Sequence, residues 1–196
     1  RLTYTGVEVC NFNGDRVRKT PRTLNWNPVM VEKQGFKHFM LKEIYEQPDF
    51  VGRTISAYVD AYDLKVSLPT RPGKKTIDFT KIDRIQIVAC GTAYYAGFVA
   101  KYWFEQIAGI VTDVDVASEF RYRDPVLTKN TLALVVTQSG ETADTKAAME
   151  YCKAQGVMTA AVVNVPTSSI ARECDAILPT LASVEIGVAS TKAFTA

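Results

Sequence analysis

Short, mostly apolar runs alternate with amphipathic stretches from residue 82 onwards. In the stretches between the runs, apolar residues recur every three or four positions, the period of a helix. The runs are IQIVA (85–89), VDVA (114–117), TLALVV (131–136), VMTAAVVNV (157–165) and AILP (176–179). Strands apolar on both faces that alternate with helices are typical of a parallel sheet covered on both sides. The pattern therefore predicts an α/β fold with a five-stranded parallel sheet.

The stretches between the runs predict the helices of this fold. Helices are expected over residues 92–109, from residue 118, over 141–156 and over 168–174. The last seven residues, STKAFTA, are typical of the first turn of another helix, with Ser190 as its candidate N-cap.

The first 75 residues follow a different pattern. Residues 1–19 predict a β-hairpin between VEVCNF and RVRK, with NGD at 13–15 as its turn. Helical spacing predicts one helix in FKHFMLKEIYEQ and a second from Pro48 to residue 62. The expected domains are residues 1–35 (hairpin and linker), 36–75 (helical linker) and 76–196 (the α/β domain). Because the chain starts without methionine and stops inside a helical turn, we expect it to be a fragment of a longer protein.

Composition and charge narrow the classes of function. The 196 residues are 47% hydrophobic and 22% charged, and the net charge of +2 is too small to indicate a nucleic-acid or anionic-membrane partner. No apolar run approaches the roughly 18 residues that cross a bilayer. Cys10, Cys90, Cys152 and Cys174 lack CxxC spacing, which argues against a zinc site or disulfides and fits a reducing cytoplasm. We expect neither a metal nor a cofactor.

Two strand-to-helix junctions carry the candidate chemistry, since ligands of open α/β sheets bind where strands end and helices begin. They are Cys90-Gly91-Thr92 and the TQSGET loop, residues 137–142. The unpaired N–H groups of a helix N-terminus can donate to an anion, and hydroxyl and amide side chains add neutral donors. There is no GxGxxG and no GxxxxGK[ST], so a monophosphate on a small polar molecule such as a sugar fits better than a nucleoside triphosphate. Taken alone, these hydroxyls could equally be helix caps.

Longer segments carry a resemblance that the loops alone do not. CGTAYYAG, SEFRYRDPV, QSGETADT, NVPTSS and EIGVASTKAFT, in that order, resemble the first sugar isomerase (SIS) domain of the glucosamine-6-phosphate synthases, the isomerising glutamine–fructose-6-phosphate aminotransferases. FKHFMLKEIYEQP resembles the segment that joins their glutaminase and isomerase halves, and RLTYTGVEVCNFNGDRV resembles the last hairpin of their glutaminase domain. The resemblance covers nearly the whole chain and implies an SIS-type three-layer αβα sandwich, preceded by a helical linker and a β-hairpin.

The resemblance also implies a substrate and its ligands. The family makes glucosamine 6-phosphate, an amino-sugar precursor of cell walls, from fructose 6-phosphate and glutamine. Carried over, Thr137, Gln138, Ser139 and Thr142 hold the phosphate. The sugar-contacting residues are Cys90, Gly91, Thr92, Val188 and Ser190, with Glu185 as a candidate to act on the sugar through one of them. Two positions depart from the usual serine of the family, Ala93 and Thr137.

The resemblance places the chemical groups of the reaction elsewhere. The glutaminase cysteine, the Schiff-base lysine and the acid/base groups of the family lie outside this stretch, so the chain alone is expected to bind without turnover and contains no catalytic residue. Lys192 is interpreted as a first-turn helix lysine, and His38 as a structural residue of the linker. The family is dimeric and cytoplasmic, which implies a homodimer. A non-catalytic phosphosugar-sensing SIS module of a regulator and a stand-alone phosphosugar isomerase are the alternatives.

Overall fold

The computed structural model describes residues 1–20, 31–69 and 71–196. The chain forms two compact units, residues 1–32 and residues 33–196, and each is described by itself. Most of the linker predicted at 20–35 lies outside the described residues. The domain boundaries at residues 35 and 75 remain predictions.

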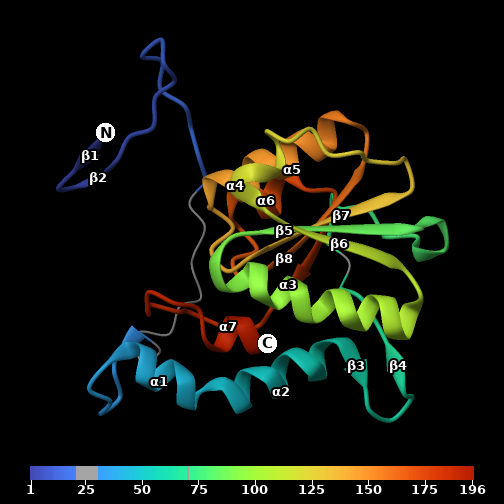
Figure 1. Cartoon of the computed structure of the whole chain (residues 1–196). Helices are drawn as coiled ribbons and strands as arrows, with labels where there is room; N and C mark the ends of the chain where they lie inside the picture. Colours follow the sequence, from blue (N-terminus) through green and yellow to red (C-terminus); the bar gives the residue numbers. More distant parts are fainter. Residues whose placement is uncertain (21–30, 70) are drawn as a thin grey trace. The chain divides into compact units, whose positions relative to one another are not determined.

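Five parallel strands form the sheet of the larger unit, in the spatial order β6-β5-β7-β8-β9 (Figure 1). Their bounds are β5 Arg84–Ala89, β6 Val111–Val116, β7 Thr131–Thr137, β8 Met158–Val163 and β9 Ala176–Pro179. The predicted five-stranded parallel sheet is confirmed. Because β5 pairs with both β6 and β7, the chain moves outward to β6 and then returns past β5 to form β7. This reversal makes the crevice between β5 and β7 the switch point, where open α/β sheets bind ligands.

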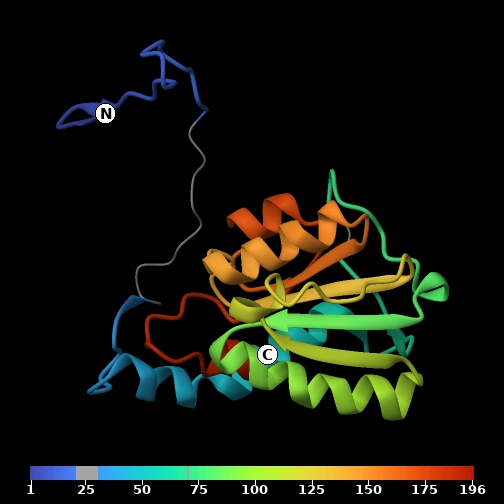
Figure 2. The same ribbon diagram turned by 45° about the horizontal axis from the view of Figure 1, so that its top comes forward.

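Helices cover both faces of this sheet, which gives the three layers seen in Figure 2. The helix on one face is α3 Gly91–Trp103, and those on the other are α4 Ala117–Phe120, α5 Ala143–Ala154 and α6 Ser169–Glu173. Alternate residues of the strands point to opposite faces. Val88 and Val135 pack with Phe120 and Met149 in one core cluster, whereas Ile87 lies in the cluster of the α3 face. The three-layer αβα sandwich is confirmed.

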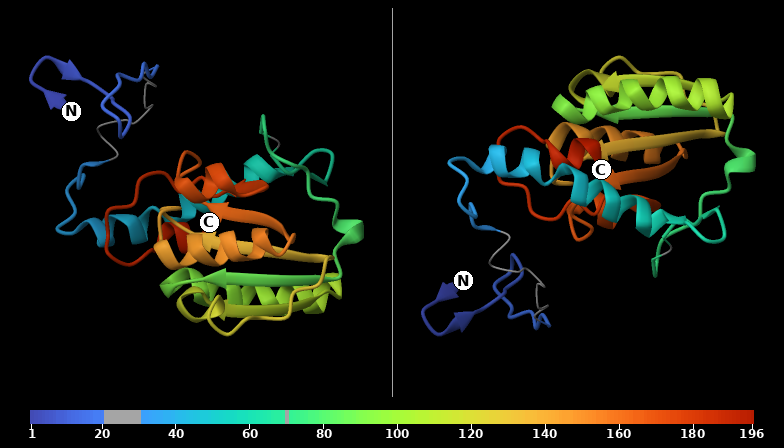
Figure 3. Two further views of the ribbon diagram at one scale, coloured as in Figure 1. Left: turned by 90° about the horizontal axis from the view of Figure 1, so that it is seen from above. Right: turned by 90° about the horizontal axis from the view of Figure 1, so that it is seen from below.

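Two linker helices, α1 Phe39–Tyr45 and α2 Gln47–Tyr58, belong to the same unit as the sheet. Pro48 stands in the first turn of α2, where its missing N–H leaves no helical hydrogen bond unmade. Both helices run beside the C-terminal helix α7 Lys192–Thr195, as the two views of Figure 3 show.

Several predicted elements have other bounds in the structure. The second linker helix was expected to reach residue 62, but it ends at Tyr58 because the carboxylate of Asp60 accepts the N–H groups of Tyr62 and Asp63 and so closes a turn. This turn joins two short antiparallel strands, β3 Val59–Asp60 and β4 Lys65–Val66.

Two further departures concern strands. The second sheet strand, predicted from residue 114, already begins at Val111. Within residues 1–20, the pairing expected between VEVCNF and RVRK consists of one bridge between Cys10 and Arg16, and the hairpin strands are β1 Leu2–Thr3 and β2 Gly6–Val7. Every residue of β1 and β2 is exposed, so no apolar face fixes a longer register in this unit.

Candidate functional site

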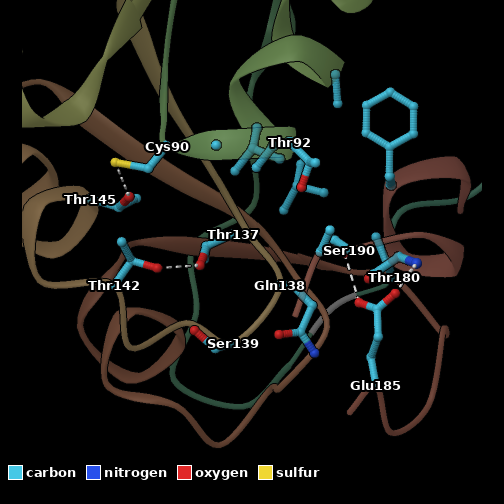
Figure 4. A pocket seen from close by; sticks show the side chains of 18 of the residues that line it. Cys90, Thr92, Thr137, Gln138, Ser139, Thr142, Thr145, Thr180, Glu185 and Ser190 are labelled. Carbon is cyan, nitrogen blue, oxygen red and sulfur yellow. Dashed lines mark hydrogen bonds between the residues drawn. The ribbon is translucent and has the colours of Figure 1, made fainter. Parts of the chain in front are cut away.

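The carboxyl ends of β5 and β7 open into one cavity of about 430 Å³, shown in Figure 4. Three segments line most of it: the turn after β5, the TQSGET loop after β7, and residues 185–190, which we call the third wall. The structure thus brings all the predicted ligand residues together, although they come from distant parts of the sequence. They are Cys90, Gly91, Thr92, Thr137, Gln138, Ser139, Thr142, Val188 and Ser190, with Glu185 beside them.

The TQSGET loop is held against α6 through Gly140. Its N–H donates to the Thr137 hydroxyl at 3.1 Å, and its carbonyl accepts the N–H of Ile170 at 3.1 Å. Gly140 has φ +67°, and a Cβ at this position would lie 1.9 Å from the buried Ser168 Oγ. Only glycine combines this left-handed backbone with so close an approach. The loop therefore has a fixed shape before any ligand binds.

Two hydroxyls of this loop accept backbone N–H groups of the loop itself, and the third, at the N-cap position of α5, does not cap the helix. Ser139 Oγ accepts the N–H of Glu141 at 3.2 Å, and Thr137 accepts that of Gly140. Thr142 is the N-cap residue of α5, but its side chain makes no capping hydrogen bond and lies 3.5 Å from the Thr137 hydroxyl. Hydrogen bonds within the loop thus account for the hydroxyls of Thr137 and Ser139, and none of the three hydroxyls caps α5. The first turn of α5 is left without a side-chain cap at the cavity, the arrangement in which a helix N-terminus accepts an anion.

The turn after β5 forms the second side of the cavity. Cys90 is the N-cap residue of α3 and also makes no side-chain cap. Gly91 has φ +58°, which lets the strand pass directly into the helix. The Thr145 hydroxyl lies 3.9 Å from Cys90 Sγ and can donate to it. This contact joins α5 to the turn across the switch point.

The third wall is organised by Glu185. Its carboxylate accepts from the Ser190 hydroxyl at 2.7 Å and from the Thr191 N–H at 2.7 Å, and so caps the short helix α7. The prediction that Ser190 caps this helix is wrong, because Thr191 is the N-cap residue and the Ser190 hydroxyl donates to Glu185. Val188 lines the cavity and is fully exposed, so it lies at the mouth.

Charge is sparse around the cavity. Among the described residues that line it, Glu185 is the only charged one, so the donors facing a ligand are neutral. Just outside, the N–H and hydroxyl of Ser169 hold the pKa of the Glu141 carboxyl below its usual value. This carboxylate accepts the Ser169 N–H at 2.7 Å and thereby caps α6 rather than its own helix. An anion in the cavity would be bound by dipoles and hydroxyls rather than by an ion pair.

Sequence reasoning missed several lining residues. Thr145 lies one turn after Thr142 on the same face of α5, so helical spacing could have found it. Thr180 directly follows β9 at the carboxyl edge of the sheet, where the switch-point rule also applies. Phe194 of α7 carries no comparable signal, because its place depends on how the C-terminal segment returns to the sheet.

Two residues weighed as alternatives lie elsewhere. Lys192 is 2% exposed and does not line the cavity; its ammonium bonds Glu46 at 2.7 Å. His38 is exposed and directly precedes α1. In the described part of the chain, no cluster of three histidine, cysteine, aspartate or glutamate residues is placed to hold a metal ion. None of the described helices is long and apolar enough to cross a membrane.

Comparisons with known proteins agree with this geometry. Residues 78–196 match the family described as SIS domain. A glutamine–fructose-6-phosphate aminotransferase [isomerizing] from Bradyrhizobium diazoefficiens is 55% identical over 194 residues, which is 99% of this chain and 31% of that protein. A protein of the same name from Thermosynechococcus vestitus is 54% identical over 207 residues, 100% of this chain and 33% of its own length. The chain therefore spans about a third of these relatives.

A solved structure gives the same picture. The C-terminal domain of glucosamine-fructose-6-phosphate aminotransferase from Francisella tularensis superposes with a TM-score of 0.71 at 46% identity. The match covers 84% of this chain and 45% of that chain.

Proposed function

Because the chain belongs to the SIS domain family, we propose that its cavity binds fructose 6-phosphate as part of an isomerising glutamine–fructose-6-phosphate aminotransferase. Relatives at 55% and 54% identity bear that name along nearly the whole chain. The cavity volume of about 430 Å³ is in the range of small-molecule sites. The product of the whole protein's reaction would be glucosamine 6-phosphate, which could occupy the same cavity.

One observation carries the phosphate assignment: the first turn of α5 reaches the cavity without a side-chain cap, next to the hydroxyl of Thr142, which bonds the Thr137 hydroxyl and not the helix. A phosphate placed there would meet N–H groups, the favourable end of the helix dipole and several hydroxyls. Gln138 and Ser139 would add an amide and a hydroxyl. Thr137 would contribute its hydroxyl hydrogen, because its oxygen already accepts the N–H of Gly140.

The remaining predicted residues would contact the sugar. Cys90, Gly91 and Thr92 face the cavity from the turn after β5, and Val188 and Ser190 from the third wall. Glu185 would act on the sugar indirectly, since it holds the Ser190 hydroxyl at 2.7 Å. Ala93 also lines the cavity, so the hydroxyl that the family often has there would be replaced by a backbone group or water.

The wider role follows from the names of the relatives and extends beyond this chain. Glutamine would be hydrolysed by another domain, and its ammonia would be transferred to the open-chain sugar by groups outside this stretch. The protein would work in amino-sugar (hexosamine) synthesis in the cytoplasm, as a homodimer. This chain alone would bind the phosphosugar without turning it over.

A regulator is the second candidate function. The sugar isomerase domain of an RpiR transcription factor from Sphaerobacter thermophilus shares the fold with a TM-score of 0.54, at 18% identity. A likeness at that identity supports the fold alone. The identity above 50% to aminotransferases along nearly the entire chain favours the enzyme.

The test is a calorimetric titration of the chain with fructose 6-phosphate, fructose and inorganic phosphate. We expect saturable binding of the phosphosugar, none of fructose, and about tenfold weaker binding by Thr142→Val, the effect of losing one hydrogen bond to a charged group. Thr76→Val, at an exposed threonine outside the cavity, is the matched control and should bind as the unsubstituted chain does. Absence of binding by the folded chain, or an equal effect of both substitutions, would contradict the proposal.

A further inference from the structure

One face of the linker helices contacts the segment that leads from β9 to α7. Along α1 and α2, contact residues recur at intervals of three or four positions, so they form a single stripe. Each has a partner between residues 179 and 192. The stripe consists of Glu43, Glu46, Phe50, Thr54 and Tyr58.

Glu43 is the member of this stripe that reaches the third wall. Its side chain accepts the N–H of Ile186 at 2.6 Å and that of Gly187 at 3.1 Å, across more than 140 residues of sequence. Glu43 is only 2% exposed, so these N–H groups replace the water that the carboxylate loses on burial. A Cβ on Gly187 would lie 2.5 Å from Glu43 Oε2, so a larger residue there would displace this carboxylate.

The two ends of the third wall are fixed by different carboxylates. Glu43 holds the backbone at Ile186 and Gly187, whereas Glu185 holds Ser190 and the N–H of Thr191. The residues between these anchors line the cavity. The backbone of the wall is therefore held by two carboxylates, and that of Glu43 lies outside the cavity on a linker helix.

Beyond the wall, the stripe also holds the start of α7. Lys192 bonds Glu46 at 2.7 Å and lies 4.3 Å from the centre of the Phe50 ring. Nearer β9, the Tyr58 hydroxyl donates to the Pro179 carbonyl at 2.8 Å. Pro179 is in addition paired with β8 in the sheet, so its position does not depend on Tyr58.

We propose that Glu43 is a positioning residue for the sugar: by holding the backbone at Ile186 and Gly187 it places Val188 and Ser190 against the ligand. Glu43 itself does not line the cavity. The inference rests on the proposed function, because it assumes that a phosphosugar occupies this site. It also makes a statement about the unliganded chain, namely that the wall is rigid only while Glu43 accepts these two N–H groups.

The experiment compares three variants of the chain by amide hydrogen exchange and by calorimetry. Glu43→Ala removes the acceptor. Glu43→Gln keeps the shape of the side chain and one of its two oxygen acceptors. Tyr58→Phe removes a hydrogen bond of the same stripe that lies away from the wall. Exchange at Ile186 and Gly187 is measured without ligand. Affinity is then measured for fructose 6-phosphate and for inorganic phosphate, which reaches the TQSGET loop but not the wall.

We expect Glu43→Ala to speed exchange at both amides and to weaken fructose 6-phosphate binding about tenfold, with phosphate binding unchanged. Glu43→Gln should recover part of both effects, and Tyr58→Phe should show neither. An equal loss of affinity for phosphate, or unchanged exchange at the two amides in Glu43→Ala, would overturn the positioning role.

Failure of the proposed function gives a different result. If the unsubstituted chain binds no phosphosugar, the role of Glu43 for the sugar is refuted together with that function. The exchange measurement still decides, in the same samples, whether Glu43 fixes the wall.

Discussion

Replacement of Gly140 by alanine tests the physical account of the TQSGET loop most directly. Gly140 has φ +67°, and its missing side chain leaves space that is filled by Ser168 and Val163. A Cβ would lie 1.9 Å from Ser168 Oγ and 3.1 Å from Val163 Cγ2. Ser168 cannot easily move, because it is 3% exposed and its hydroxyl accepts the Ala171 N–H at the start of α6.

Two unfavourable contributions to the stability of the Gly140→Ala variant add up. The left-handed conformation costs alanine about 1–2 kcal/mol, and overpacking a buried site costs about 1–3 kcal/mol. The free energy of unfolding should therefore fall by about 2–5 kcal/mol. With a urea m-value of about 2 kcal/mol/M, the midpoint would fall by at least about 1 M.

Gly156→Ala separates these contributions. Gly156 has φ +75° just beyond α5, but a Cβ there meets nothing within 4 Å. This control should lose only the conformational part, about 1–2 kcal/mol. Urea unfolding followed by circular dichroism measures both variants under the same conditions. An equal loss of unfolding free energy in the two variants would refute the argument that Ser168 and Val163 fill the space next to Gly140.

Three further substitutions probe the ionic and apolar contacts of the larger unit. Burial raises the pKa of Asp175, but hydrogen bonds from an ammonium, a backbone N–H and a hydroxyl lower it by more, to below its ordinary value of 3.8. The stability it contributes is present above that value and lost as pH falls through the lower folded pKa, so Asp175→Asn should flatten the acid limb of a stability-versus-pH curve. Lys192→Met should destabilise the chain by about 1.5–3 kcal/mol in urea unfolding, because Glu46 loses one of its two ammonium partners and keeps Lys42 at 3.4 Å. Phe120→Ala, at the end of α4 and fully buried in the core, should cost about 3–5 kcal/mol in the same assay.

Local sequence patterns were sufficient to predict the sheet and two sides of the cavity. TLALVV is apolar at nearly every position because β7 is covered on both faces, and the hydroxyls and glycine of TQSGET follow it directly. The same holds for IQIVA and CGT. The carboxyl ends of parallel strands meet at one edge, so adjacency in space followed from the order of strands and helices.

Contacts between distant segments were beyond the reach of such patterns. Glu43 and Glu46 have the spacing of an ordinary exposed helix face, and their partners near residues 186 and 192 leave Glu43 buried and Glu46 only partly exposed. Likewise, no local pattern predicts that Glu185 caps α7. At Asp60, a side-chain hydrogen bond to the following backbone ended a helix whose apolar spacing continued.

The distance in sequence between Glu43 and the third wall has a consequence for synthesis on the ribosome. The two partners are 143 residues apart, so at about 5–20 residues per second roughly 7–30 s separate their emergence. Helices of 7 and 12 residues are marginal by themselves in water, and until residues 179–192 are made, α1 and α2 lack the segment that carries their partners. Strands β5 to β8 are complete before that segment, and the linker helices can dock only when it follows. A nascent chain halted before residue 179 would therefore carry most of the sheet and the TQSGET loop, while its linker helices would remain accessible to proteases and chaperones.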